Sequence, residues 1–304
     1  MNIGLRAEAT INSAVEFSGI GVHSGSQVKM KVLPAQKETG ILFKRTDVFD
    51  KHPFIKLSPN SVVNPVLCTR IANKDGISVA VIEHLLAAFR IAGITNALVE
   101  IDFEEVPIMD GSAKVFFDEF RKTGLLVQDS FVPAIVIESP VSTHSKDGHI
   151  SITPSDAPKI NVKLSYDRIN PVVKDNNCYA FNLSNGLSNL AKARTFGWLE
   201  DFEKIKSLGL GHGASEENTV IIMPDNSIKN ELRDEKELVM HKCLDLLGDI
   251  SVIGYDIIGE INGVNTSHAL NNMLMRKLLS EIKLHRVISG NNEAKYSNID
   301  FALC

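Results

Sequence analysis

The chain has 304 residues, of which 44% are hydrophobic and 23% charged, and its formal net charge is -5 at pH 7. This length predicts about two domains, and a mildly acidic chain without long lysine and arginine runs disfavours nucleic acid as the main partner. Four well-separated cysteines without a C-x-x-C pair, no apolar run of the roughly 18 residues that a membrane-spanning helix needs, and no signal-peptide pattern predict a reduced, cytoplasmic protein.

In the first half, apolar and polar residues alternate over 28–32, which predicts a strand with one buried face. The glycines within 19–25 predict a turn, and their G-x-G-x-x-x-G spacing without a following helix disfavours a dinucleotide-binding site. Apolar residues at helical spacing over 81–91 predict a helix, and a strand-like run follows at 97–103. A second helix is expected after its cap at 110–112.

The second half repeats the order of the first. A glycine again separates a long predicted helix from a strand and a last helix, as it does in the first half. The predicted elements are strands at 135–138, 160–164 and 220–223, a helix at 235–253, a strand at 256–261 and a helix at 268–282. This shared order predicts two similar layers, each a sheet covered by helices.

The repeat therefore predicts an α+β protein with two similar domains. We expect the first domain to span residues 1–127 and the second 133–290, because the segment between them is polar and ends in a proline. Residues 291–304 are polar and aperiodic, which predicts a loose tail.

The segment HKCLDLLGD (241–249) carries the strongest chemical signal. On a helix, His241, Asp245 and Asp249 are spaced i, i+4 and i+8, and therefore lie on one face. An imidazole and a carboxylate one turn apart can bind the same metal ion, as the two histidines of H-E-x-x-H do. A solvent-facing polar stripe is the alternative, but the flanking residues are apolar and a third polar residue continues the row.

Glu83 and His84 form a second unusual pair, because they begin a predicted helix with apolar residues on both sides. Ionisable side chains in such a run are costly unless they are paired or bind something, although a hydrogen-bonded core histidine is the alternative. His84, His241 and Asp245 together give the ligand number of a catalytic zinc site with an open fourth position. Glu83 could then accept a proton from water, in a site shared by the two halves.

His268 stands at the start of the last predicted helix. The helix dipole disfavours an imidazolium there, so a protonated His268 needs a carboxylate partner, for which Asp249 is a candidate. A surface histidine near a helix cap is the alternative. No serine lies in a G-x-S-x-G motif, so an acyl-enzyme mechanism has little support.

Three glycine-rich or basic segments have weaker signals. Lys192, Arg194 and Thr195 could contact an anionic or hydroxyl-rich ligand, or belong to an ordinary loop. His23 and His212 lie among glycines, where histidines are more often turn residues than ligands.

Taken together, eight segments occur in unbroken order between about residues 15 and 280, and H-K-x-x-D-x-x-G-D is the most specific of their patterns. They are SGIGVHSG (18–25), ILFKRTD (41–47), VLCT (66–69), VIEHLLAAF (81–89), PIMDGSA (107–113), ARTFG (193–197), HKCLDLLGD (241–249) and SHALNN (267–272). In these segments the chain resembles the UDP-3-O-acyl-N-acetylglucosamine deacetylases of lipid A biosynthesis.

The resemblance implies a fold, a cofactor and a reaction. Each domain would be a small, mainly antiparallel sheet packed on a pair of helices, with the active site between the domains. Zn²⁺ would be bound by His84, His241 and Asp245, a ligand set that also accepts Fe²⁺. The reaction would be hydrolysis of the 2-acetamido group of a UDP-linked, 3-O-acylated glucosamine, giving the free amine and acetate. The partners would be this substrate and, at most transiently, a membrane, and the protein would be a monomer.

The resemblance also implies the roles of further residues. Glu83 would be the general base, and His268, held by Asp249, would stabilise the oxyanion and protonate the leaving amine. Thr195 would assist at the oxyanion. The substrate would be contacted by Lys242, Phe196, Leu67 and Cys68, and its acyl chain by the insert at residues 197–218.

The residues themselves allow two alternative functions. A metal-free module that binds nucleotide sugars between its halves would contain no stoichiometric metal. A zinc hydrolase acting on another acylated amine would differ only in the substrate that an assay identifies.

Overall fold

The computed structural model describes residues 5–165, 178–182, 187–290 and 292–294. It has a mixed α+β fold, with six α-helices and several sheets among these residues. None of the described helices has the length and apolar character that crossing a bilayer requires.

The first large sheet has the strand order β2-β3-β8-β4-β5. Its neighbouring strands are antiparallel except for β4 and β8, which are parallel because the chain crosses over between them through helix α1. Helix α2 follows β8. The bounds are β2 (Val15–Ile20), β3 (Gln27–Pro34), β4 (Ile41–Arg45), β5 (Phe54–Lys56), α1 (Glu83–Ala92), β8 (Ala97–Ile101) and α2 (Lys114–Thr123).

The second large sheet repeats this topology in the order β11-β12-β18-β13-β14. Again one central pair, β13 and β18, is parallel and the other neighbours are antiparallel. Helix α6 precedes β18 and helix α7 follows it. The bounds are β11 (Val141–His144), β12 (His149–Thr153), β13 (Lys159–Lys163), β14 (Cys178–Asn182), α6 (Glu237–Ser251), β18 (Glu260–Val264) and α7 (His268–Ser280).

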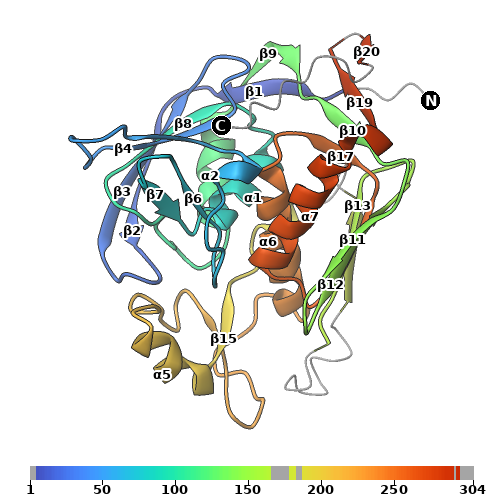
Figure 1. Cartoon of the computed structure of the whole chain (residues 1–304). Helices are drawn as coiled ribbons and strands as arrows, with labels where there is room; N and C mark the ends of the chain where they lie inside the picture. Colours follow the sequence, from blue (N-terminus) through green and yellow to red (C-terminus); the bar gives the residue numbers. More distant parts are fainter. Residues whose placement is uncertain (1–4, 166–177, 183–186, 291, 295–304) are drawn as a thin grey trace.

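The helices lie between the two large sheets (Figure 1). Helix α2 contacts β2, α6 contacts β13 and β14, α7 contacts β11 and β12, and α1 packs against α6 in the middle. Apolar and polar residues alternate along β3, so one face of the sheet is apolar and packs on the helices. Val28, Met30 and Val32 are buried on that face, while the lysines between them point outward. The central position of α1 and α6 brings the two halves of the chain into contact.

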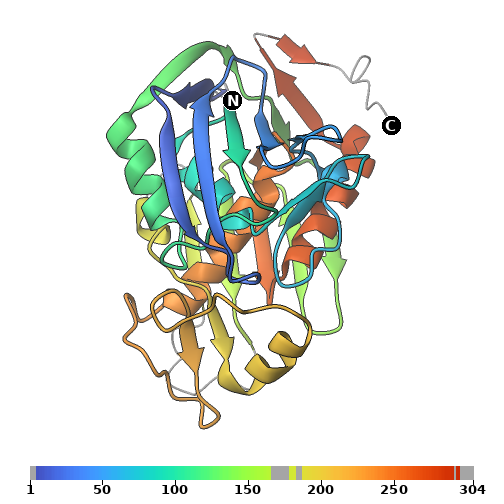
Figure 2. The ribbon, with the colours of Figure 1, turned by 90° about the vertical axis from the view of Figure 1, so that its left-hand side faces the viewer.

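Smaller elements complete the fold, and Figure 2 shows α5 at the bottom of the molecule, at the end of the central helices. The remaining strands are β1 (Ala7–Ile11) paired with β9 (Leu125–Phe131), β6 (Arg70–Ala72) with β7 (Ser78–Ala80), β15 (Phe196–Trp198) with β16 (Val220–Ile222), and β10 (Ala134–Val136) with β17 (Asp256–Ile258) and β19 (Arg286–Ser289), the last also pairing β20 (Asn292–Ala294). The remaining helices are α4 (Leu187–Leu190), α5 (Leu199–Ser207) and the 3-10 turns Pro59–Ser61 and Ile282–Leu284.

The predicted helices at 81–91, 235–253 and 268–282 are confirmed as α1, α6 and α7 with small changes at their ends. The single strand predicted at 256–261 is wrong, because Gly259 divides it into β17 and β18, which belong to different sheets. A Cβ on Gly259 would lie 2.7 Å from the Ile137 side chain and 3.0 Å from the Thr153 carbonyl oxygen, so the chain bends where only glycine fits.

The segment predicted to join the domains is partly a strand. β9 covers residues 125–131 and pairs with β1, so strand pairing within the first half continues to Phe131. Leu126 and Val127 are both exposed there, at 55% and 67%, so the alternation that reveals most strands is missing. In the tail predicted at 291–304, Asn292–Ala294 form β20, while residue 291 and residues 295–304 lie outside the described residues, so the loose tail stays a prediction.

Candidate metal centre and catalytic site

The site forms where helix α1 begins beside the middle of α6. His241 and Asp245 lie one turn apart on α6, and Glu83 and His84 are the first residues of α1. The two backbones touch at Gly248, where an added Cβ would lie 2.1 Å from the Glu83 carbonyl oxygen. The missing side chain of Gly248 therefore allows the two helices to approach closely enough to share a site.

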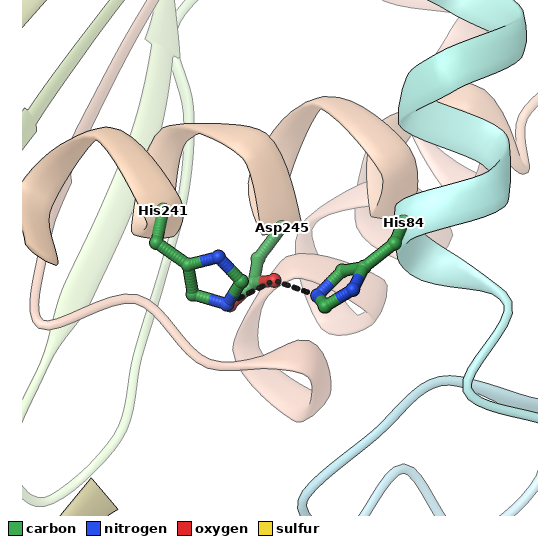
Figure 3. A group of neighbouring side chains, drawn as sticks. All are labelled: His84, His241 and Asp245. Atoms are coloured by element: carbon green, nitrogen blue, oxygen red, sulfur yellow. Dashed lines mark ion pairs between the residues drawn. The ribbon is translucent and has the colours of Figure 1, made fainter. Parts of the chain in front are cut away.

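The side chains of His84, His241 and Asp245 point toward one another, as predicted from the sequence (Figure 3). The Asp245 Oδ1 atom lies 3.2 Å from His241 Nε2 and 3.5 Å from His84 Nε2, and all three side chains are buried. A tetrahedral zinc site with ligands about 2.0 to 2.1 Å from the ion separates neighbouring ligand atoms by about 3.3 Å. The donor set and its spacing therefore fit zinc.

The charge state of these residues also fits a cation. Burial opposes the ionisation of Asp245, but the positive charge of the Lys242 ammonium group beside it favours the carboxylate and holds the Asp245 pKa well below its usual range. Burial lowers the pKa of His241 to about 3, so its imidazole is neutral. Asp245 Oδ2 accepts a hydrogen bond of 2.8 Å from Lys242 Nζ, whereas Asp245 Oδ1 is buried without a hydrogen-bond partner among the described residues. A buried, unpartnered anionic oxygen beside the neutral His241 imidazole is an arrangement that a bound cation would complete.

The orientation of His241 is fixed by the backbone of the ARTFG segment. Its Nδ1 atom lies 3.1 Å from the Ala193 carbonyl oxygen. Because a carbonyl oxygen can only accept, Nδ1 carries the proton and Nε2 offers its lone pair toward Asp245. Such a partner fixes the tautomer of a metal-binding histidine and raises its basicity.

Beside the triad, Glu83 and His268 face each other across 3.8 Å between Oε1 and Nε2. Asp249 Oδ2 accepts from His268 Nδ1 at 2.9 Å and from Asn271 Nδ2 at 2.8 Å. Thr69 links the two carboxylates, since its backbone N–H donates to Glu83 at 2.9 Å and its hydroxyl donates to Asp249 at 2.5 Å. The predicted pairing of Asp249 with His268 is present in this geometry.

The two facing groups have shifted pKa values. Burial alone would lower the pKa of His268, but the charges of Asp249 and Glu83 outweigh it and raise this pKa to about 10. Burial raises the pKa of Glu83, which the neighbouring His268 and His84 partly offset. At neutral pH His268 is therefore an imidazolium, and the affinity of the Glu83 carboxylate for a proton is increased.

A cavity of about 510 Å³ opens onto these groups and contains most of the predicted substrate-binding residues. Thr195, Phe196, Lys242 and Leu67 all line it, and the Lys242 ammonium lies 5.5 Å from the centre of the Phe196 ring. Apolar side chains of the insert that contains α5 form its outer part, among them Trp198, Leu199, Phe202 and Ile205.

Cys68 lies apart from the other predicted substrate residues. It is buried in a small apolar cluster with Ala80, Val81 and Ile108 and is absent from the described cavity lining. Burial, reinforced by the charge of Glu83, raises the pKa of its thiol to about 12, so the thiol stays protonated. The contact between Cys68 and substrate that the resemblance implies stays a prediction.

The weaker sequence candidates fall into two groups. His23 lines the cavity, and His212 is linked to it through a backbone hydrogen bond of 3.1 Å from the His212 N–H to the His23 carbonyl oxygen. Lys192 pairs with Asp234 at 3.1 Å rather than lining the cavity, and the buried Arg194 pairs with Glu237.

Sequence reasoning missed Thr69, Asn271 and Gly248. A glycine in the middle of an amphipathic helix is itself a signal of close packing, so Gly248 could have been found. Val81 was also missed: it precedes Glu83 by two residues and has a φ of 57°, which is strained for a β-branched residue. No local pattern predicts that backbone angle.

Comparison with known proteins gives one consistent result. The model of the family described as UDP-3-O-acyl N-acetylglycosamine deacetylase matches residues 8–280. The chain is 36% identical over 284 residues to the UDP-3-O-acyl-N-acetylglucosamine deacetylase of Campylobacter fetus, covering 93% of this chain and 95% of the relative. The enzyme of the same name from Nitratiruptor is 34% identical over 300 residues, with 98% of both chains covered, and that from Helicobacter pylori is 35% identical over 299 residues, with 97% and 98% covered.

Proposed function

Because the chain belongs to the family of UDP-3-O-acyl-N-acetylglucosamine deacetylases, we propose that His84, His241 and Asp245 hold its zinc ion and that Glu83 and His268 carry out the proton transfers. The activity itself follows from the family: the chain is a zinc-dependent deacetylase of lipid A biosynthesis. The observation that carries the proposal is the buried triad with its unpartnered Asp245 oxygen beside the facing Glu83 and His268.

In the proposed mechanism, Glu83 accepts a proton from water as the water oxygen bonds to the acetyl carbon. When bound, zinc supplies a Lewis acid for the amide carbonyl and lowers the pKa of water to about 7. The His268 imidazolium and the Thr195 hydroxyl donate toward the developing oxyanion, the kind of preorganised stabilisation that contributes most to many such reactions. The C–N bond then breaks, the amine nitrogen takes a proton from His268 or Glu83, and acetate and the free amine leave.

The proposed substrate is the UDP-linked, 3-O-acylated N-acetylglucosamine that the family name describes. Lys242 and Phe196 lie beside the triad, where they would contact the sugar, and Leu67 lines the same cavity. The apolar part of the cavity under α5 suits the acyl chain, since apolar walls bind alkyl groups by excluding water. Cys68 is left out of this proposal.

Replacing Asp249 with asparagine is expected to shift the alkaline limb of the pH profile. Activity that needs protonated His268 is lost as the pH rises through the His268 pKa. Asp249→Asn removes the nearest charge that raises this pKa, so burial lowers it and the alkaline limb of kcat/KM moves to lower pH. A pH–rate profile of both proteins checks this, and an unchanged limb removes His268 as the acid.

Metal analysis of the purified protein tests the proposed centre. We expect about one equivalent of zinc, loss of deacetylase activity on chelation and its return when zinc is added. Iron(II) is the proposed alternative ion, because imidazole and carboxylate ligands suit it as well. Full deacetylation by metal-free protein would overturn the proposal, and metal-free protein that only binds the nucleotide sugar would support the binding-module alternative.

The proposal also covers the domain arrangement, the cellular location and the oligomeric state of the protein. The two halves with the same strand order are proposed as the two domains of a sandwich with the site between them. A cytoplasmic location, a monomeric state and at most transient membrane contact through the lipid substrate stay predictions.

A further inference from the structure

Glu237, the first residue of α6, lies one helical turn before His241 and is fully buried. Both of its carboxylate oxygens are engaged. Oε1 accepts from the Arg194 backbone N–H at 3.0 Å and from Arg194 Nε at 2.9 Å. Oε2 accepts from Arg194 Nη2 at 3.1 Å and from the Arg233 N–H at 2.6 Å. One carboxylate therefore holds both the main chain and the side chain of Arg194.

Stability alone does not account for such a pair. Bringing two charges out of water costs several kcal/mol, and apolar replacements of buried ion pairs are often neutral or stabilising. What the pair does provide is a fixed geometry, since a guanidinium and a carboxylate joined by parallel hydrogen bonds have a defined relative orientation.

The segment that the Arg194–Glu237 pair holds in place is part of the catalytic site. Arg194 stands between Ala193, whose carbonyl oxygen lies 3.1 Å from His241 Nδ1, and Thr195, which lines the cavity. The Thr195 N–H donates to the Gly111 carbonyl oxygen at 2.8 Å, so the same segment also contacts the first half of the chain. His84 lacks such support, because its Nδ1 atom is buried without a partner among the described residues.

We propose that Arg194 and Glu237 form a positioning pair, which holds residues 193–195 so that the Ala193 carbonyl orients His241 for the metal and Thr195 faces the substrate. This inference rests on the proposed role of His241 as a metal ligand. Partners of this kind change metal affinity or activity about 10 to 100-fold when they are lost.

The test compares the fully buried carboxylate of Glu237 with the partly buried carboxylate of Asp256. Glu237→Gln keeps the shape of the side chain but replaces an acceptor with an amide that meets the donors of Arg194, so the 193–195 segment loses its position. The matched control is Asp256→Asn, because Asp256 also pairs with two arginines, Arg6 at 3.1 Å and Arg90, but lies outside the described lining of the catalytic cavity.

Zinc affinity, measured by competition with a chelating dye, is the main readout. We expect Glu237→Gln to bind zinc about 10 to 100-fold more weakly and to lower kcat more than it changes KM. We expect Asp256→Asn to lower the melting temperature while zinc affinity stays that of the wild type. Wild-type zinc affinity in folded Glu237→Gln would overturn the inference.

A second variant separates positioning from folding. Arg194→Met with Glu237→Met removes both buried charges while keeping apolar volume, so we expect it to fold and still to bind zinc more weakly than the wild type. Wild-type zinc affinity in this double variant would also overturn the inference. A wild-type protein that binds no stoichiometric zinc would instead overturn the proposed function, and this inference with it.

Discussion

Glu83→Gln is expected to lower turnover at least about 100-fold while the protein still binds zinc. Glu83 stands beside the metal triad but is not part of it, and its carboxylate faces His268 across 3.8 Å. An amide of the same shape cannot take a proton from water, whereas it still accepts the Thr69 N–H bond. The loss should therefore appear in kcat, and the melting temperature should change little.

His84→Ala is the matched comparison, because His84 is the next residue on the same turn of α1. Removing one of three ligands should abolish stoichiometric zinc binding together with activity. Measuring both zinc content and turnover separates the two roles. Retained turnover in Glu83→Gln would exclude Glu83 as the general base, and zinc loss in that variant would assign it to the metal site instead.

Gly248→Ala is expected to destabilise the protein by about 1 to 3 kcal/mol and to reduce activity about 100-fold. The added methyl group would lie 2.1 Å from the Glu83 carbonyl oxygen, a backbone atom that cannot turn away. Helices α1 and α6 must then separate, which moves His84 away from Asp245. Thermal unfolding and zinc competition would measure both effects.

Ser251→Ala provides the control for helix propensity. It lies on the same helix, and alanine there raises helix propensity without adding volume. We expect this control to keep zinc affinity and turnover. If Gly248→Ala behaves in the same way, the close approach of the two backbones is not what determines the spacing of the ligands.

Much of the site could be predicted because its ionisable residues occur within apolar segments, where such residues are uncommon. His241, Asp245 and Asp249 share one helical face inside an apolar segment, and Glu83 and His84 begin another apolar helix. Charged groups at buried positions are costly, so ionisable residues within apolar segments indicate a functional site from the sequence alone. The helices were predictable for a related reason, since their apolar periodicity is long and regular.

What could not be predicted depends on contacts between distant segments. Thr69 reaches both Glu83 and Asp249 only because the turn before β6 packs against α6. At Gly259 the chain passes from β17 in one sheet to β18 in another. The local alternation of apolar and polar residues does not indicate this change of sheet. The burial of Cys68 likewise follows from packing against Ile108, far from it in sequence, whereas the resemblance suggested a substrate contact.

The triad joins α1 of the first half to α6 of the second, and this has a thermodynamic consequence. An ion that binds only the native arrangement stabilises the fold by an amount that grows with the logarithm of its free concentration, about 2.7 kcal/mol at 100 times its dissociation constant. An ion bound by this triad would therefore also oppose separation of the two halves. Under metal starvation the cell would lose folded protein as well as catalytic turnover.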